Sequence, residues 1–341
     1  MAISIDASHV AESYDSGNMK QDVSDIIFNI DPSETPLLSN MGTRDVSNTT
    51  FEWNTESLPA SDDSNAKLEG ADFNSEAVTQ VVRNTNQTQI SSRNATVTGT
   101  MTAVSQYGKQ SEMAHQMMLV SKSLKLDIDK TIGSHQASSA GLANQASSGE
   151  RKTESLTHML SRGSNVIVGS TGGTTVPTSS GGAYTEGTAH DDLDESKFVD
   201  VAQKIYENGG KLDSVVCTPA LKREISDFTG RGGTQVVVDE SKVTSNVTVF
   251  ASDFGNVKMM LSRNLQSYGS GGGFNTAGAG GTDLLFVDFS MAKVAFLRNF
   301  TRQTLGVRGD SSSEQIIAEW GVQLSNFDSG GVRHNLDPVY S

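Results

Sequence analysis

The periodicity of hydrophobic residues changes along the chain, and each change predicts a different kind of element. Residues 1–44 are polar with short apolar islands and show no sustained period. Pro32 and Pro36 each bias the preceding residue toward extended backbone. This segment is therefore predicted to be an N-terminal arm that runs over a surface and is not a domain of its own.

Residues 45–105 alternate apolar and polar side chains with a period of two, which is typical of β-strands. A polar tip from Ser57 to Phe73 separates the alternating segments, which are Thr50–Asn54, Val78–Val82 and Ser92–Met101. Two long antiparallel arms joined by such a tip form a β-ribbon. Because an isolated ribbon is marginal in water, we expect it to lie on a neighbour.

Residues 106–138 change to a helical period. Apolar side chains recur every three or four residues and form one stripe: Met113, Met117, Val120, Leu124, Ile128 and Ile132. Such a stripe is most often part of a core, although methionines also suit an adaptable contact between subunits.

Residues 139–190 are rich in Gly and Ser, which is typical of a flexible connection, with a weak strand at Asn165–Val168. An α/β pattern follows. Asp192–Glu195 fits a capping box for a helix that buries Phe198 and Ile205 and ends at Asn208–Gly210. A second helix begins at Pro219 and is expected to run to Thr229–Gly230. The predicted strands of this lobe are Ser214–Cys217, Gln235–Val238, Asn246–Phe250 and Val257–Ser262.

The C-terminal part of the chain is rich in predicted strands: Leu284–Phe289, Val294–Leu297, Arg298–Val307 and Gln315–Leu324. The tripeptide Arg308-Gly309-Asp310 matches an adhesion motif, but Gly and Asp are also turn residues. We interpret it as a turn between two strands. These strands carry no apparent chemical group, which favours a structural protein.

The composition favours a flat or extended body over a compact enzyme. Of the 341 residues, 35% are hydrophobic and 33 are Gly. A low apolar content suits long polar loops and apolar surface that becomes buried between subunits. A normal globular protein with a few disordered loops is the alternative that composition leaves open.

The net charge of −14 leaves no basic footprint for binding nucleic acid. A protein of this kind would enclose DNA and would not recognise its sequence. The same acidity keeps subunits soluble before they assemble.

The sequence predicts no secretion and no membrane span. The first residues lack a basic region followed by an apolar one, and no apolar run approaches the ~20 residues that cross a bilayer. Cys217 is the single cysteine and lies in an apolar run, so we expect a buried, inert thiol. The chain is thus expected to be made in a reducing cytoplasm.

We predict no catalytic, cofactor-binding or metal-binding residues. The Gly-rich stretches 169–182 and 269–281 lack the helix and Lys-Ser/Thr pair of a phosphate loop. Asp191 to Glu195 do not have calcium-loop spacing, and helix capping explains them. The six histidines lack a paired spacing or a Cys partner, which argues against zinc: His9, His115, His135, His158, His190 and His334. One sequence does not reveal residues that converge only in space.

The order of these elements resembles the major capsid protein of tailed bacteriophages, and within that group the phage major head family of podovirus-like and related phages. The resemblance covers nearly the whole chain and rests on short motifs taken together: Asp31–Leu38, Phe51-Glu52-Trp53, Thr218–Lys222, Ser252–Val257, and Leu297-Arg298 through Gly309–Ser311 to Ala318-Glu319-Trp320.

The resemblance implies an α+β fold of the Hong Kong 97 type with named parts. These are the N-terminal arm (1–44), the β-ribbon or E-loop (45–105), the peripheral domain with its spine helix and linker (106–189), the α/β axial domain at the capsomer centre (190–282), and the returning strands of the peripheral domain (283–341). It implies a non-enzymatic protein that self-assembles as hexamers and pentamers into an icosahedral shell around double-stranded DNA, which it meets only by non-specific proximity.

The family also implies partners, a location and, in some members, a covalent crosslink between subunits. A separate scaffolding protein is expected, together with a portal and decoration proteins, with assembly in the host cytoplasm and residence in the virion. Some relatives crosslink a ribbon lysine to a neighbouring asparagine. Lys67 would be that lysine and Asn299, Asn326 and Asn335 its candidate partners, but most relatives lack this chemistry and we do not expect it.

Two alternatives stay open at this point. The first is an enzyme or ligand-binding protein whose α/β lobe at 190–282 forms a deep pocket. The second is a tail or fibre protein, which predicts internal repeats or coiled-coil segments, and neither is evident in the sequence.

Overall fold

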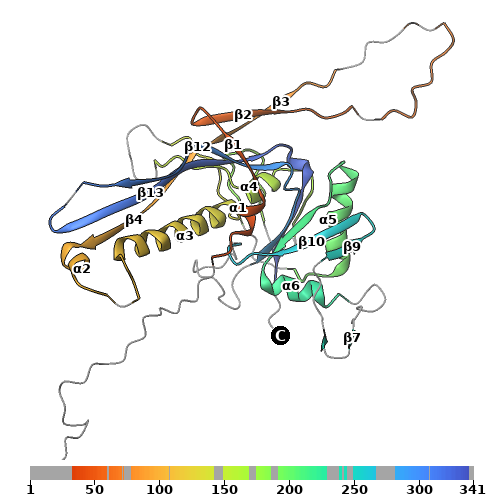
Figure 1. The fold of residues 1–341 in the computed structure, drawn as a ribbon. Helices are drawn as coiled ribbons and strands as arrows, with labels where there is room; N and C mark the ends of the chain where they lie inside the picture. The colour runs from red at the N-terminus through yellow and green to blue at the C-terminus, as the bar shows by residue number, and fades with distance from the viewer. Residues whose placement is uncertain are drawn as a thin grey trace, which may run out of the picture.

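The computed structural model of the chain is built from two β-sheets and one long helix (Figure 1). The structure describes residues 33–59, 61–70, 72, 78–106, 108–141, 149–168, 174–185, 191–228, 238–239, 242–243, 249–265, 281–306 and 308–337. Several predicted features fall wholly or partly outside these residues: the arm before Ser33, the strand residues 235–237 and 246–248, the Gly-rich stretch 269–280, and His9 and His190.

The first sheet has four strands in the order β1-β12-β13-β4. These are β1 (Gly42–Asp45), β12 (Ala292–Thr304), β13 (Ser311–Leu324) and β4 (Gln89–Thr98). Strands β12 and β13 form a long antiparallel hairpin, and β4 pairs antiparallel with β13 along its whole length. The sequence predicts two strands here, Val294–Leu297 and Arg298–Val307. The structure instead has one continuous strand, with irregular register between Phe296 and Thr301.

Helix α3 (Glu112–Ile132) lies along this sheet (Figure 1). The hydroxyl of Ser111 caps it by accepting a hydrogen bond from the Ala114 amide at 3.4 Å. The predicted apolar stripe is confirmed at Met117, Leu124, Ile128 and Ile132, which are buried. Met113 and Val120 are half-buried. The last three of the buried residues belong to the larger core cluster.

The second sheet has six strands in the order β5-β14-β11-β6-β10-β9. These are β5 (Val166–Val168), β14 (Gly331–Leu336), β11 (Thr282–Val287), β6 (Ser214–Cys217), β10 (Gly255–Leu261) and β9 (Val249–Ser252). Helices α5 (Glu195–Glu207) and α6 (Pro219–Ser226) belong to this lobe, on the other side of the molecule from α3 (Figure 1).

Local signals placed the elements of this lobe well. The predicted capping box, Asp192–Glu195, places the cap at Asp192, but helix α5 begins two residues later, after Asp194. The Asp194 carboxylate accepts a hydrogen bond from the Glu195 amide at 2.7 Å. Its predicted core residues, including Phe198 and Ile205, are buried. Helix α6 starts at Pro219 as predicted but ends at Ser226, three residues before the expected Thr229.

The remaining elements are short. They are α1 (Pro36–Asn40), α2 (Gly99–Ala103), α4 (Leu156–Leu160), the 3₁₀ turn η2 (Phe327–Ser329), the hairpin of β2 (Thr50–Thr55) with β3 (Val82–Gln87), and the small pair of β7 (Val238–Asp239) with β8 (Lys242–Val243).

The predicted ribbon is shorter than expected. Only β2 and β3 pair as an isolated hairpin, and residues 78–81 lie outside any strand. The third ribbon segment instead forms β4 of the four-stranded sheet, and Met101 at its expected end lies in the helical turn α2. A strand that pairs within a large sheet is more stable than one in a free ribbon, which is the reason for this difference.

Part of the expected surface arm belongs to the body of the protein. Helix α1 packs on α3, and Leu37 is fully buried between them. The Leu38 amide donates a hydrogen bond to the buried carboxylate of Asp129 on α3 at 2.9 Å, and the Asn264 side chain donates to its other oxygen at 2.8 Å. Burial and these polar contacts make residues 36–45 a packed segment and not a surface strap.

The returning C-terminal strands divide between the two sheets. Strands β12 and β13 join the sheet beside α3. Strands β11 and β14 instead join the sheet of the α/β lobe, where β11 pairs with β6 and β14. The boundary drawn at residue 283 therefore cuts through β11 and separates strands of one sheet.

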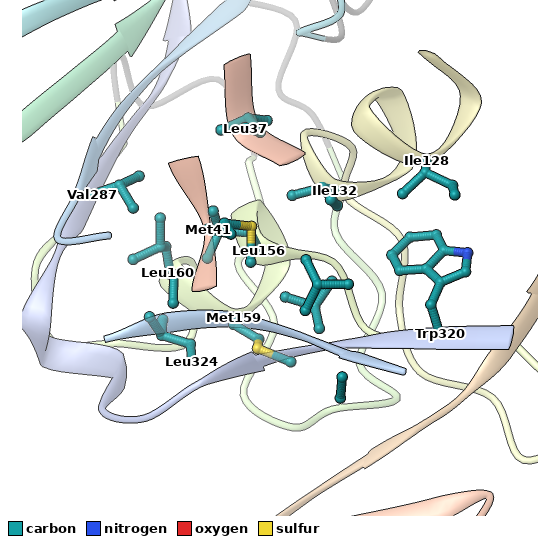
Figure 2. Packing of buried hydrophobic residues seen from close by; sticks show 14 of the residues in the cluster. Leu37, Met41, Ile128, Ile132, Leu156, Met159, Leu160, Val287, Trp320 and Leu324 are labelled. Carbon is teal, nitrogen blue, oxygen red and sulfur yellow. The ribbon is translucent and has the colours of Figure 1, made fainter. Parts of the chain in front are cut away.

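The core consists of two clusters of buried side chains. The larger cluster lies between α3, α1 and α4 on one side and β13 on the other. Figure 2 shows ten of its labelled members pointing toward one another: Leu37, Met41, Ile128, Ile132, Leu156, Met159, Leu160, Val287, Trp320 and Leu324. The second cluster lies inside the α/β lobe around Phe198, whose ring contacts Phe250 and Phe286 at centroid distances of 4.8 and 5.1 Å.

Strand β11 contributes to both clusters. Leu284 and Phe286 point into the lobe cluster, whereas Leu285 and Val287 point into the larger one. Alternate side chains of a strand point to opposite faces, so β11 is buried on both. This explains why its sequence is a continuous apolar run and does not alternate with polar residues.

Gly321 in β13 is a position where a side chain does not fit. A Cβ added there would lie 2.6 and 2.9 Å from two carbons of the Phe51 ring and 3.0 Å from the Gln87 carbonyl oxygen. Gly321 thus allows the base of the β2–β3 hairpin to approach the four-stranded sheet closely.

We expect Gly321→Ala to lower the free energy of unfolding by about 1–3 kcal/mol, because the added methyl displaces the Phe51 ring or the hairpin backbone. Urea unfolding followed by circular dichroism measures this. Gly306→Ala is the matched control, since a Cβ at Gly306 meets nothing within 4 Å. Equal stability of the two variants would contradict the proposed close approach.

Ionisation of the Asp129 carboxyl makes the free energy of unfolding depend on pH. Burial raises the pKa of this carboxyl despite the hydrogen bonds from Asn264 and Leu38. A raised folded-state pKa means that folding favours the protonated form, so this contribution to stability is present at low pH and is lost as the pH rises through the folded pKa.

Relative to Asp129→Asn, the unaltered chain should therefore lose stability between about pH 4, the ordinary range of an Asp carboxyl, and pH 7. Paired urea titrations of the two chains at several pH values give the difference. A difference that stays constant, or that moves in the opposite direction, would show that burial does not dominate at this carboxyl.

Candidate assembly surfaces

The β2–β3 hairpin extends away from both sheets (Figure 1) and has a buried base. Phe51 and Trp53 alternate with outward side chains and are 5% and 8% exposed. Their rings stack with a centroid distance of 5.9 Å, and Trp53 meets the edge of Phe327 at 6.5 Å. The hairpin is therefore packed onto the body by one face of β2.

Asn86 of β3 attaches the hairpin with polar bonds as well. Its side-chain amide donates to the Val322 carbonyl at 2.6 Å and to the Thr153 hydroxyl at 3.0 Å. Its side-chain oxygen accepts a hydrogen bond from the Glu154 amide at 2.8 Å. Because Asn86 is 1% exposed, these bonds are shielded from water and hold the hairpin in one orientation.

The connection between β2 and β3 exposes apolar side chains. Leu58 is 94% exposed, Leu68 83% and Val78 88%. Scattered exposed apolar residues are common, but these lie on one projecting segment whose own chain does not cover them. They form a candidate contact surface for another molecule, which we call the hairpin tip (the described residues 56–59, 61–70, 72 and 78–81).

Strand β12 offers a second surface through its backbone. Strand β1 pairs with β12 only from Lys293 to Phe296. Beyond Phe296, the outer edge of β12 pairs with no strand among the residues that the structure describes. Residues 298–304 on this edge are exposed, and such an edge is ready to accept a further strand.

A third exposed apolar area lies on the α/β lobe. Tyr206 of α5 is 64% exposed, with its ring 5.6 Å from that of Phe254 in the β9–β10 turn. Val249 at the start of β9 is 52% exposed. Strand β9 is also the edge of its sheet among the described strands, so exposed apolar side chains lie beside a backbone edge that no described strand covers.

The residues considered for crosslinking are placed differently from one another. Lys67 lies on the hairpin tip and is exposed, as are Asn299 on β12 and Asn326 before η2. Asn335 in β14 is only 1% exposed, so a lysine from a neighbouring molecule does not reach it.

Cys217 lies in β6 with its side chain fully buried. Its thiol donates a weak hydrogen bond to the Met260 carbonyl at 3.6 Å. Burial raises the pKa of this thiol to about 12, against a small opposing effect of Lys222. Since the thiolate is the reactive form, Cys217 is an inert core residue, in line with the prediction.

Arg308-Gly309-Asp310 forms the turn between β12 and β13, as predicted. Gly309 has φ of 62°, a left-handed conformation that favours glycine. The Ser311 hydroxyl donates to the Arg308 carbonyl at 2.7 Å and completes the turn.

The acidic group at 191–195 has structural partners. Asp194 caps α5, and Asp191 forms ion pairs with Lys197 and Arg333 at 2.5 and 2.8 Å. Burial by itself would raise the pKa of Asp191, but the bonds to Lys197 and Arg333 outweigh it and lower the pKa. These contacts attach the start of α5 to β14.

Sequence reasoning missed a cluster of histidines in the interior. His135, His158 and His334 come from three separate segments, and all three lie in the described core region. The carboxylate of Asp283 lies between His135 and His334, and His158 pairs with Glu154 at 2.8 Å. Large sequence separations hide this convergence, and no local spacing signals it.

The electrostatics of Asp283 follow from this setting. Burial would raise the pKa of Asp283, but the charges and hydrogen bonds of His334 and His135 outweigh it and hold the pKa well below its usual range. Burial lowers the pKa of His135, although Asp283 opposes this shift.

Among the described helices, none combines the length and the apolar character that crossing a membrane requires.

Comparison with known proteins agrees with this architecture. Residues 8–337 match the family model of the SU10 major capsid protein. A curated relative, the major capsid protein of Escherichia phage Phieco32, is 26% identical over 237 residues. That alignment covers 61% of this chain and 66% of the relative, so the chain spans just under two thirds of the relative's length.

Solved structures with a similar fold come from phages. A chain from Mycobacterium phage Adephagia has a TM-score of 0.57 at 12% identity, with 97% of this chain and 99% of that chain covered. A chain from Microbacterium phage Oxtober96 has a TM-score of 0.59 at 11% identity, covering 93% and 96%. A chain from the capsid structure of Cyanophage P-SCSP1u has a TM-score of 0.54 at 11% identity, covering 93% and 92%.

At these identities the structural likeness shows the fold alone, and it confirms the expected α+β fold of the Hong Kong 97 type. The family match extends over nearly the whole chain and includes both sheets, α3 and the hairpin. The chain therefore belongs to the SU10 major capsid protein family.

Proposed function

We propose that many copies of this chain assemble into the icosahedral head shell that encloses phage DNA. The observation that carries the proposal is the β2–β3 hairpin, which is rigidly attached at its base and exposes apolar residues at its tip. A projecting segment of this kind lowers its free energy when a neighbouring molecule covers it. Family membership supports the same function.

The parts of the fold have matching roles in this proposal. The hairpin and its tip act as the E-loop, and α3 with the β12–β13 sheet forms the peripheral domain. The α/β lobe, residues 190–282 together with the strands that complete its sheet, acts as the axial domain at the centre of hexamers and pentamers.

Contacts between subunits then use the three exposed surfaces. The outer edge of β12 accepts a strand of a neighbour, with backbone hydrogen bonds supplying affinity and side chains supplying register. Apolar residues of the hairpin tip become buried on the adjacent subunit. A set of small contacts repeated around each capsomer gives a large total interface.

The acidic composition fits a wall around DNA. A net charge of −14 opposes strong binding of phosphates, so packaged double-stranded DNA is enclosed by the shell and not gripped by it. We further propose a separate scaffolding protein, a portal and decoration proteins as partners, with assembly in the host cytoplasm and residence in the virion.

A catalytic role finds no comparable support. The enzyme alternative requires a deep pocket with convergent polar groups in the α/β lobe. One hollow that touches this lobe, of about 480 Å³, lies between α1 and β10. Its lining is Glu34, Thr35, Pro36, Ser39 and Met259–Leu261, which offers a single carboxylate and no partner for acid–base chemistry.

Assembly can be tested through the hairpin tip. The full chain, produced together with its scaffolding protein, should form closed shells visible by electron microscopy and sedimenting as large particles. The double variant Leu58→Glu with Leu68→Glu should assemble at least about tenfold less, since it places charge in a contact that becomes desolvated. Its melting temperature should be unchanged, because both side chains are exposed in the single chain.

Ser57→Glu with Asn65→Glu is the matched control, with the same added charge at neighbouring exposed positions and no loss of an apolar side chain. Two results would refute the proposal. One is a wild-type chain that stays monomeric under assembling conditions. The other is a Leu58/Leu68 variant that assembles as well as the control.

A further inference from the structure

Three side chains of metal-ligand type converge in the interior from separate segments. His135 follows α3, Asp283 lies in β11 and His334 lies in β14. One ligand atom from each lies within 4.8 Å of the others. The side chains are 3%, 7% and 0% exposed, so the cluster is shielded from water.

Both histidines direct a ring nitrogen at the same carboxylate. His334 Nδ1 lies 3.0 Å from one oxygen of Asp283, and His135 Nε2 contacts the other oxygen. The Tyr184 ring lies parallel to the His135 ring, with a centroid distance of 3.7 Å, and covers the cluster on that side.

The hydrogen bond made by the other ring nitrogen of His334 determines whether Nδ1 carries a hydrogen or a lone pair. His334 Nε2 lies 2.9 Å from the Ser161 hydroxyl oxygen. That hydroxyl has one hydrogen, and it is donated to the Thr157 carbonyl at 2.7 Å, an oxygen that only accepts. With the hydroxyl hydrogen donated in this direction, Nε2 of His334 carries a hydrogen and donates to Ser161.

A neutral imidazole carries one N–H, so Nδ1 of His334 then presents a lone pair to the carboxylate of Asp283. A proton or a metal ion between this nitrogen and the carboxylate removes the repulsion between their lone pairs. A bound cation would also compensate the charge of Asp283, whose ion-pair partners among the described residues are these two histidines and not Lys or Arg.

We propose that His135, Asp283 and His334 bind one divalent transition-metal ion of the zinc class. Two imidazole nitrogens and one carboxylate are a ligand set for zinc and related ions, whereas magnesium and calcium prefer oxygen ligands alone. The three protein ligands leave one position of a tetrahedron for water.

The surrounding contacts match those of bound metals in proteins. A metal-ligating histidine normally donates its second N–H to a neighbouring acceptor, which fixes the ring orientation. The bond from His334 Nε2 to Ser161 performs this function, and Ser161 is itself fixed by Thr157.

The ion would hold together parts of the chain that are far apart in sequence. His135 belongs to the segment that leaves α3, and Asp283 and His334 lie on neighbouring strands of the six-stranded sheet. Metal binding would therefore stabilise the junction between the helix α3 side and the α/β lobe. Metal binding at this site depends on these contacts and does not require shell assembly.

Metal content and affinity of the purified full chain test the site. We expect about one zinc per chain by elemental analysis, removable by a chelator and restored by added zinc. Saturating zinc should raise the melting midpoint of the chelator-treated chain by about 5–10 °C. Cobalt in place of zinc should give the visible absorption of a tetrahedral site with nitrogen and oxygen ligands.

Variants separate this site from adventitious surface binding. Asp283→Asn and His334→Gln should abolish the stoichiometric metal and the metal-dependent rise in melting midpoint. Ser161→Ala, which changes only the orienting bond, should weaken zinc binding about 10–100-fold. His115→Gln on α3 is the matched control and should bind zinc as the unaltered chain does, because His115 lies outside the cluster.

Ser161→Ala and the cobalt spectrum of the unaltered chain keep the test decisive if the ligand variants fail to fold. The proposal is overturned if the full chain binds neither zinc nor cobalt at micromolar concentrations. It is also overturned if cobalt gives only the spectrum of a solvated octahedral ion, or if the Ser161 variant and the His115 control bind zinc equally well.

Discussion

The structure depends on one strand that is buried on both of its faces. Strand β11 directs Leu284 and Phe286 into the core of the α/β lobe and Leu285 and Val287 into the core beside α3. Each of these side chains is at most 2% exposed, and burying a side chain of this kind contributes about 1.5–3 kcal/mol. Since one strand supplies side chains to both cores, neither half of the molecule forms its full core without β11.

A body joined in this way can support a projecting segment. The β2–β3 hairpin is attached to the body through Phe51, Trp53 and Asn86. These residues contact β13, η2 and the segment before α4. Gly321 allows this approach at the cost of a side chain. A stiff base with an apolar tip is suited to a protein whose remaining contacts are made by other copies of itself.

Buried polar groups connect segments that apolar packing alone would leave free to slide. Asp129 connects α3 to α1 and to the segment after β10, and Asn86 connects the hairpin to the segment before α4. Glu154 accepts from Arg162 at 2.9 Å and pairs with His158. Hydrogen bonds have strict geometry, so each of these groups selects one arrangement of its partners, whereas apolar contacts tolerate several.

The sequence by itself determined the elements whose signals are local. The apolar stripe that includes Leu124, Ile128 and Ile132 predicted α3. The group Asp192–Glu195 and the spacing of Phe198 and Ile205 predicted α5, although the capping residue proved to be Asp194. The order of these elements also indicated the fold family. Periodicity and capping are properties of neighbouring residues, so a single chain displays them without knowledge of its partners.

The tertiary structure decided which elements meet. Strand β14 was not predicted, because Arg333, His334 and Asn335 are polar and are buried only through partners such as Asp191 and Asp283. Alternation correctly indicated a strand before Met101 but did not show that it joins β13 in place of a ribbon. Strand pairing and the convergence of His135 with His334 depend on contacts between residues far apart in sequence, and a one-dimensional pattern carries no information about them.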